Sequence, residues 1–195
     1  MSRGLLVAAA AALVLLAGCT SDGSGRPAEQ AASRPDVSTV ATDLLPCPDQ
    51  TDQPAASKDL PDLQLPCFSG GSLDLGKAPG VPMVVNFWAS WCGPCREELP
   101  LVQQLADGAG GRVRVVGIVS KDGVTQSTSF AADATATFPS AFDQDGDVMT
   151  KLGFATLPRT YLVTADGHVA FVQAGVVHSL DQFEQLVHEH LGVTL

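Results

Sequence analysis

Residues 87–95 read Phe87-Trp88-Ala89-Ser90-Trp91-Cys92-Gly93-Pro94-Cys95, and this stretch decides how the rest of the chain is interpreted. It continues an apolar run, residues 82–89, whose composition predicts a strand buried on both faces of a sheet. It leads into residues 96–106, where leucine and valine recur at helical spacing. The two cysteines are therefore expected between a buried strand and the first turn of a helix.

The position of this cysteine pair suits thiol chemistry. A helix N-terminus carries unpaired backbone N–H groups and the positive end of the helix dipole, and both stabilise a thiolate. We therefore expect Cys92, which is nearer that end and nearer solvent, to have a lowered pKa and to act as the nucleophile. Cys95, one turn later and more buried, would resolve the mixed disulfide. Trp91, Gly93 and Pro94 support the pair, since two intervening residues let the sulfurs bond and proline is tolerated in a first helical turn.

Two other interpretations of the pair are open at this point: a structural disulfide and half of a zinc site. A structural zinc ion takes four ligands. The chain has one Cys-x-x-Cys motif and four dispersed histidines, so two further ligands are not evident. The sequence Asp143-Gln144-Asp145-Gly146-Asp147 has the composition of a calcium loop but not its ligand spacing, and it predicts a turn. We expect no metal and no other cofactor.

The residues around the pair also resemble a known family. Residues 87–95 resemble the thioredoxin active-site segment, and the continuation through Arg96-Glu97-Glu98-Leu99-Pro100 resembles the TlpA/ResA branch of extracytoplasmic thioredoxin-like lipoproteins. The resemblance extends over roughly residues 60–190. It implies an α/β protein with a thioredoxin-like fold, in which helices flank a central mixed β-sheet and a hairpin is added at the N-terminal side. It also implies an enzyme, a thiol–disulfide oxidoreductase.

The resemblance implies a role for Pro158. Leu157-Pro158 directly precedes a predicted strand, where the family has a cis-proline packed against the active-site cysteines. A plain loop proline is the alternative. The family usually has a small hydroxyl residue after this proline, whereas Arg159 stands here and would favour acidic partners.

The resemblance also implies a role for Glu98. Thioredoxin has a buried acid in the strand before the cysteines, at the place where this chain has Asn86. The TlpA/ResA branch instead has an acid just beyond the second cysteine, which Glu98 matches. On the inner side of the helix this carboxyl group would be desolvated, its pKa raised, and it would exchange a proton with Cys95. The alternative is a solvated carboxylate that the helix dipole favours.

The beginning of the chain predicts export. Arg3 precedes an apolar run over residues 5–16 that is too short to cross a bilayer and is typical of a signal peptide. The run leads into Leu16-Ala17-Gly18-Cys19, which resembles the bacterial lipobox, although an ordinary signal peptide with an incidental cysteine is the alternative. We expect a lipoprotein signal peptide at 1–18, a lipidated Cys19 with a flexible linker at 19–43, and the thioredoxin-like domain at 44–195.

The remaining cysteines suggest a second pair. Setting Cys19 aside leaves four cysteines, and an even number in an exported chain favours disulfides. Cys92 and Cys95 form the local pair, which leaves Cys47 with Cys67. Both lie next to prolines and neither is placed at a predicted helix start, so we expect a structural disulfide that holds the N-terminal segment to the domain. A second redox pair is the alternative.

Spacing and turn residues predict the other elements. Strands are expected around residues 63–65, 73–75, 82–89, 113–119, 160–163 and 168–172, and helices around 96–106, 127–133, 148–152 and 180–191. The first two strands form a small hairpin across Gly70-Gly71, and the last two form a hairpin across Ala165-Asp166-Gly167. This order predicts a mixed sheet covered by helices.

Charge narrows the class of partner. The chain has 11 basic and 21 acidic residues, a formal charge of −10 that excludes a polybasic surface for nucleic acid or lipid headgroups. The resemblance implies an extracytoplasmic protein, lipid-anchored to the outer face of the cell membrane, that exchanges a dithiol for a disulfide with exported proteins. It implies a reductant of the cytochrome c maturation type that receives electrons from a membrane electron-transfer protein.

A disulfide-forming oxidase of the same fold is the main alternative. Local dipoles and hydrogen bonds spread the reduction potentials of such pairs over about 150 mV, and the sequence does not show these details. A copper chaperone of similar fold is the alternative function that would not make this protein an enzyme. Such proteins usually space their cysteines three apart and add a nearby histidine, and this motif has neither feature.

Overall fold

The computed structural model describes residues 36–195. The predicted signal peptide and Cys19 lie outside the described residues. Within residues 36–195, no helix has the length and apolar character needed to cross a bilayer. Packing begins earlier than the predicted domain boundary at residue 44, because the side chain of Val37 is already fully buried in the core.

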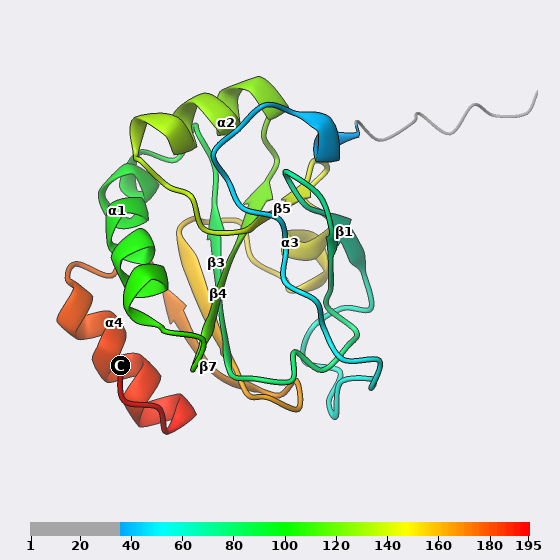
Figure 1. Cartoon of the computed structure of the whole chain (residues 1–195), viewed down its shortest axis with the longest axis vertical. Helices are drawn as coiled ribbons and strands as arrows, with labels where there is room; N and C mark the ends of the chain where they lie inside the picture. The colour runs from blue at the N-terminus through cyan, green and yellow to red at the C-terminus, as the bar shows by residue number, and fades with distance from the viewer. Residues whose placement is uncertain (1–35) are drawn as a thin grey trace, which may run out of the picture. The chain divides into compact units, whose positions relative to one another are not determined.

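A five-stranded mixed sheet organises the molecule (Figure 1). Its strands lie in the order β5-β4-β3-β6-β7. Strands β3, β4 and β5 are mutually parallel, β6 is antiparallel to β3, and β7 is antiparallel to β6. A separate hairpin, β1–β2, precedes the sheet in the chain. The strands are β1 Gln64–Pro66, β2 Ser72–Asp74, β3 Met83–Trp88, β4 Arg114–Ser120, β5 Ser140–Asp143, β6 Arg159–Val163 and β7 Val169–Ala174. The helices are α1 Gly93–Gly108, α2 Val124–Asp133, α3 Asp147–Lys151 and α4 Leu180–Leu191, with a short 3-10 helix, η1, at Val37–Thr39.

The predicted elements are present, and one strand was missed. Strand β5 lies between α2 and α3, beside β4, with all four of its residues buried. Its sequence, Ser-Ala-Phe-Asp, contains no β-branched residue and shows no alternation, so it carries no local strand signal. Tertiary contacts stabilise the strand instead. β5 pairs with β4, and the Phe68 N–H donates to the Ser140 carbonyl at 3.0 Å.

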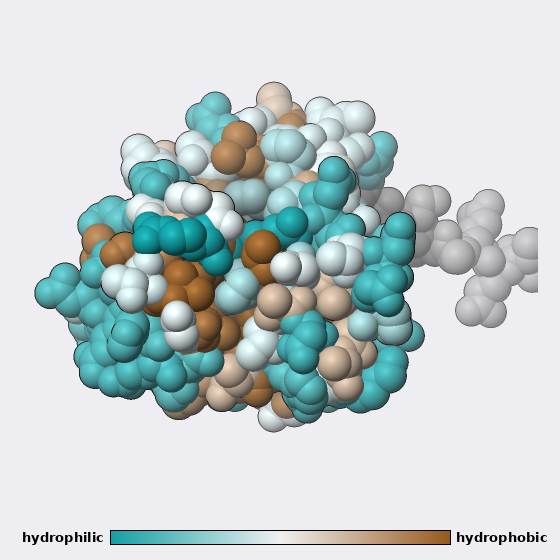
Figure 2. All heavy atoms as spheres, turned by 60° about the horizontal axis from the view of Figure 1, so that its bottom comes forward, coloured by the Kyte–Doolittle hydropathy of each residue, from teal (hydrophilic) through white to brown (hydrophobic). Residues whose placement is uncertain are grey.

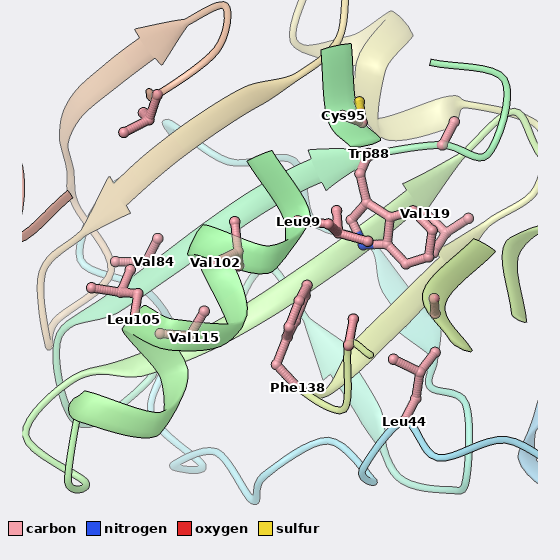
Figure 3. Close-up of a cluster of buried hydrophobic side chains, with 14 of the residues drawn as sticks. Leu44, Val84, Trp88, Cys95, Leu99, Val102, Leu105, Val115, Val119 and Phe138 are labelled. Atoms are coloured by element: carbon pink, nitrogen blue, oxygen red, sulfur yellow. The ribbon is translucent and has the colours of Figure 1, made fainter. Parts of the chain in front are cut away.

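Two apolar clusters fill the two faces of the sheet. One unites side chains of α1, α2 and α4 with the adjacent sheet face, and the other unites the β1–β2 hairpin and α3 with the opposite face. Figure 3 shows the first cluster, where Leu99 and Val102 of α1 reach toward Trp88 and the β3–β4 surface. Trp88 is fully buried and stacks on Phe130 with ring centroids 5.8 Å apart. The start of α1, with its cysteines, is therefore supported by a packed core.

The segment before β1 is tied to the domain at two points. Leu44 is buried in the first cluster, and the Leu45 N–H donates to the Thr137 carbonyl at 2.8 Å. Cys47 and Cys67 are joined by a disulfide with their Cα atoms 5.8 Å apart. The segment thus contacts both clusters, with Leu44 in the first and Cys47 in the second.

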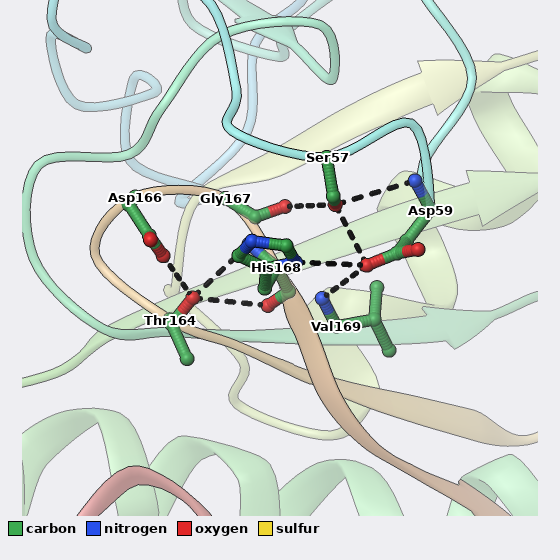
Figure 4. A network of polar contacts seen from close by, with 7 residues as sticks. All are labelled: Ser57, Asp59, Thr164, Asp166, Gly167, His168 and Val169. Atoms are coloured by element: carbon green, nitrogen blue, oxygen red, sulfur yellow. Dashed lines mark hydrogen bonds and ion pairs between the residues drawn. The ribbon is translucent and has the colours of Figure 1, made fainter.

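Polar contacts fasten the β6–β7 turn to the segment that precedes the hairpin (Figure 4). The carboxylate of Asp59 accepts from the Ser57 hydroxyl at 2.6 Å and from the Val169 N–H at 3.1 Å, and it lies 3.5 Å from His168 Nδ1. These residues lie near the end of β6, which pairs with the start of β3. The network is therefore at the opposite edge of the sheet from the cysteines. Figure 2, which brings the bottom of Figure 1 forward, shows mostly hydrophilic side chains there around a smaller apolar patch.

Candidate active site

Cys92 and Cys95 form a disulfide at the N-terminus of α1. Their sulfurs are 2.05 Å apart, and α1 begins at Gly93, directly after Cys92. Cys92 is the N-cap residue, and its sulfur accepts a hydrogen bond from the Cys95 N–H at 3.2 Å. The exposed fraction is 4 % for Cys92 and zero for Cys95, so Cys92 is the sulfur that an incoming molecule reaches first.

Trp91 stands exposed beside the disulfide. Its exposed fraction of 55 % is high for a large apolar side chain, and Gly93 and Pro94 on the other side of Cys92 are exposed as well. The indole N–H of Trp91 donates to the Lys121 carbonyl at 2.8 Å. The ring is therefore held in one place while most of its surface is open to a partner.

Glu98 lies one turn after Cys95 on α1 and is fully buried. Its carboxylate accepts from the Val177 N–H at 2.7 Å and from the Asn86 side-chain amide at 2.9 Å. Burial raises the pKa of Glu98 above its ordinary value of 4.5, and the two hydrogen bonds offset only part of that effect. The carboxyl group is thus held inside the core, three residues after Cys95 on the same helix.

Asn86 connects this acid to the sheet. The same amide nitrogen donates to the Thr160 hydroxyl at 2.9 Å, while the amide oxygen has no hydrogen-bond partner. Asn86 and Thr160 are directly opposite each other in the β3–β6 register. The sequence suggested that Asn86 replaces the buried acid of thioredoxin, and the structure shows this amide in contact with Glu98.

Pro158 lies at the same edge of the sheet. The Leu157–Pro158 peptide bond is cis, and the proline is buried immediately before β6. Because β6 runs antiparallel to β3, its first residues lie at the end of β3 that leads to the cysteines. The guanidinium of Arg159 stacks over the Phe154 ring at 4.6 Å, which draws its charge toward that aromatic ring.

Several residues around the pair were not predicted. Val177 contacts Glu98, Thr160 contacts Asn86 and Asp122 contacts the cysteine turn only because the fold brings distant segments together. For Asp122 a signal was present, because polar residues that directly follow parallel strands gather at one edge of the sheet. Among the described residues, no group of three or more histidine, cysteine or acidic side chains is arranged to hold a metal ion.

Comparison with known proteins decides the family. The Redoxin family profile matches residues 54–187. The chain belongs to the Redoxin family. It is 32 % identical over 130 residues to the thiol-disulfide oxidoreductase ResA of Oceanobacillus iheyensis, covering 64 % of this chain and 67 % of that protein. It is 35 % identical over 97 residues to the thiol:disulfide interchange protein DsbE of Escherichia coli, covering 49 % and 51 %.

A solved structure agrees with these relatives. A secreted Mycobacterium tuberculosis disulfide oxidoreductase, described as homologous to DsbE, superposes with a TM-score of 0.56. The two chains are 26 % identical over 67 % of this chain and 95 % of that one. This Redoxin family member is therefore an enzyme, a thiol–disulfide oxidoreductase of the ResA/DsbE type with a thioredoxin-like fold. The predicted family, fold and enzyme class are confirmed.

Proposed function

We propose that this oxidoreductase reduces disulfides in exported proteins, with Cys92 as the nucleophile and Cys95 as the resolving cysteine. One arrangement carries the proposal: the Cys92–Cys95 disulfide caps the N-terminus of α1, with buried Glu98 one turn beyond it. The N–H groups and dipole of α1 stabilise a thiolate at Cys92, and exposed Trp91 offers a surface to the partner polypeptide.

The reaction moves two electrons from the dithiol to the substrate. The Cys92 thiolate attacks one sulfur of the substrate disulfide, which breaks that bond, forms a mixed disulfide and releases a substrate thiolate. Cys95 then loses its proton and attacks the Cys92 sulfur, which forms the intramolecular disulfide and releases the second substrate thiolate. The substrate thiolates take up protons. The protein ends in the oxidised form that the structure shows.

Glu98 supports the second step as proton acceptor. Cys95 is fully buried, so its proton has no direct path to water. Glu98 is the buried acid on the same helix, three residues after Cys95, and burial raises its pKa above its ordinary value, which favours proton exchange with a thiol. Pro158, at the adjacent end of β6, would border the incoming polypeptide, and Gly93 and Pro94 would keep the turn open to it.

Each turnover as a reductant consumes the dithiol, so a donor must restore it. A membrane electron-transfer protein would serve as that donor, and the sulfurs to be reduced would belong to apocytochrome c. The relatives named ResA and DsbE support a place among extracytoplasmic thiol–disulfide proteins. The Gly-Pro dipeptide between the cysteines is the one found in thioredoxin and favours reduction.

The reduction potential of the Cys92–Cys95 pair tests the direction. The domain would be equilibrated with glutathione or dithiothreitol buffers of known potential, and its free thiols would be counted by alkylation and mass. A value near that of thioredoxin, about −270 mV, supports the reductant. A value near about −120 mV would identify a disulfide donor of the same fold and would reject the cytochrome c proposal.

The mixed disulfide tests the order of the cysteines. Replacing Cys95 by alanine leaves Cys92 without its resolving partner, so substrate proteins should accumulate as covalent adducts that dithiothreitol releases. The matched variant Cys92→Ala should accumulate none. Adducts that form through Cys95 rather than Cys92 would reverse the assignment.

We further propose that Cys19 carries a lipid and that the residues between Cys19 and the packed domain tether it to the outer face of the cell membrane. A Cys19→Ser variant is then expected to leave the membrane fraction while keeping its oxidoreductase activity. Metabolic labelling with a fatty acid would show the loss of lipid directly. Retention of both label and membrane association in Cys19→Ser would contradict the anchor.

A further inference from the structure

The loop that follows β4 forms hydrogen bonds with the turn that carries the cysteines. The Asp122 carboxylate accepts from the Ser90 N–H at 2.6 Å and from the Ser90 hydroxyl at 2.8 Å, one bond to each carboxylate oxygen. One of these oxygens also accepts from the Gly123 N–H at 2.8 Å. Hydrogen bonds to a carboxylate are stronger than those between neutral groups. Ser90, two residues before Cys92, is therefore held from a segment 32 residues away in sequence.

The neighbouring residue holds the same turn at a second point. The Lys121 carbonyl accepts from the Trp91 indole N–H at 2.8 Å. Lys121 has a backbone φ of +54°, a left-handed conformation that is uncommon for a residue with a side chain. Such conformations persist where the surroundings require them, and they gather at functional sites. The loop thus contacts both residues that precede Cys92.

The loop at Lys121 and Asp122 is itself hydrogen-bonded to the sheet, so it holds the cysteine turn in a fixed position. The Lys121 N–H donates to the Asp143 carbonyl at 3.1 Å, and the Ser120 hydroxyl donates to the Asp143 carboxylate at 3.0 Å. The aliphatic stem of Lys121 packs so closely over Gly146 that a Cβ there would overlap it. Movement of the cysteine turn relative to β4 and β5 is thereby opposed.

We propose that Asp122 is a positioning residue for the Cys92–Cys95 pair, acting through Ser90, while the Lys121 carbonyl beside it orients Trp91. The proposal rests on the proposed role of Cys92 as the nucleophile. Asp122 does not touch the substrate disulfide. It keeps the turn in the geometry in which Cys92 attacks, because its carboxylate holds the residue two positions before Cys92.

Other charged groups lie at this edge of the sheet and bear on any titration of Cys92. They are Lys121 and Asp145 beside Trp91, Arg96, Glu97 and Glu98 on α1, and Arg159 after Pro158. Asp145 provides the matched control, because it is an exposed carboxylate that lines the same groove as Asp122 and Trp91. Its removal also takes one carboxylate from this groove, and it leaves the hydrogen bonds between Asp122 and Ser90 in place.

The experiment compares Asp122→Asn, Ser90→Ala and Asp145→Asn with the unmodified protein. Two quantities are measured: the rate of insulin disulfide reduction with dithiothreitol as reductant, and the pH midpoint of Cys92 alkylation by iodoacetamide. We expect Asp122→Asn to slow reduction about five- to tenfold, because charge-assisted hydrogen bonds to Ser90 are lost. We also expect its alkylation midpoint to move to lower pH, because a nearby negative charge is removed.

The controls separate positioning from charge. Ser90→Ala keeps the carboxylate and loses one hydrogen bond, so it should slow reduction about two- to threefold with an unchanged midpoint. Asp145→Asn should leave the rate unchanged. A folded Asp122→Asn that matches the unmodified protein in rate and midpoint overturns the proposal. If Asp122→Asn fails to fold, an unchanged rate in Ser90→Ala overturns it.

The design also distinguishes failure of the proposed function. If the unmodified protein reduces no insulin, the reductant role fails, whereas alkylation of Cys92 still reports the effect of Asp122 on the turn. Slower alkylation of Cys92 at a pH above its midpoint in both Asp122→Asn and Ser90→Ala, with Asp145→Asn unchanged, would then still support the positioning role, whereas an unchanged alkylation rate in both would overturn it.

Discussion

At the scale of single residues, the buried acid Glu98 has a hydrogen-bond partner, Asn86, that can bind it in both its ionised and its protonated form. With Glu98 ionised, the Asn86 amide nitrogen donates to it and the amide oxygen has no partner. Rotating the amide by half a turn would present that oxygen to a protonated Glu98 and to the Thr160 hydroxyl. An amide, unlike a second carboxylate, can therefore satisfy Glu98 in both protonation states.

The variant Glu98→Gln tests this arrangement. We expect it to fold within about 1 kcal/mol of the unmodified protein, because Gln can accept from Val177 and donate to a rotated Asn86. It should shift the pH dependence of thiol reactivity, measured by alkylation, because the exchangeable proton is gone. Exposed Glu97 on the same helix supplies the control Glu97→Gln. An unchanged titration in Glu98→Gln would remove Glu98 from the mechanism.

The same residue makes stability depend on pH. Burial raises the pKa of Glu98 in the folded state above its ordinary value of 4.5, so folding favours the protonated form. The stabilisation of the fold that comes from protonated Glu98 is fully present below the pKa of Glu98 in the unfolded chain. It is lost as pH rises through the pKa of Glu98 in the folded protein. Denaturant unfolding of both proteins at a series of pH values should therefore show the unmodified protein losing stability relative to Glu98→Gln above pH 4.5.

At the scale of elements, β4 carries a glycine, Gly117, at the level where it pairs with Asn86 of β3 and Ser140 of β5. A Cβ at Gly117 would lie 2.5 Å from the Trp88 indole nitrogen, 2.5 Å from the Ser140 hydroxyl and 2.9 Å from the Phe138 ring. All three neighbours are fully or nearly fully buried. The close packing of the Trp88, Phe138 and Ser140 side chains over β4 therefore depends on the missing side chain.

We expect Gly117→Ala to destabilise the fold by about 1–3 kcal/mol, because an added methyl group overpacks the core. Gly108→Ala is the matched control, since a Cβ at Gly108 meets nothing within 4 Å and alanine is the better helix former. Urea unfolding of the two variants would measure the difference. Equal stability of Gly117→Ala and the unmodified protein would show that the side chains packed over Gly117 can shift at little cost.

At the scale of the whole molecule, the disulfide between Cys47 and Cys67 holds the N-terminal segment to the domain. The two residues are 20 apart in sequence, and loop-closure entropy gives about 3 kcal/mol for such a bond. Cys67 is fully buried and Cys47 nearly so, and neither caps a helix. Both features favour a structural role over a second redox pair.

The double variant Cys47→Ala/Cys67→Ala should therefore unfold at lower denaturant concentration, by about 3 kcal/mol, while retaining disulfide reductase activity. The double variant Cys92→Ala/Cys95→Ala should lose disulfide reductase activity. It should lose less stability than Cys47→Ala/Cys67→Ala, because its disulfide closes a shorter loop. In the unmodified protein, alkylation after mild reduction should label Cys92 and Cys95 only. Equal labelling of all four cysteines would contradict the structural role.

The sequence by itself determined the local features of this protein: the strand, the Cys-Gly-Pro-Cys turn, the helix after it and the family to which they point. These follow from periodicity and from residue types that act within a few positions of one another. The tertiary structure alone decided that β5 is a strand, that Asn86 and Val177 bind Glu98, and that Thr160 binds Asn86. It also decided that Asp122 holds Ser90. Their contacts join segments 12 to 79 residues apart, and such contacts form only when the whole core packs.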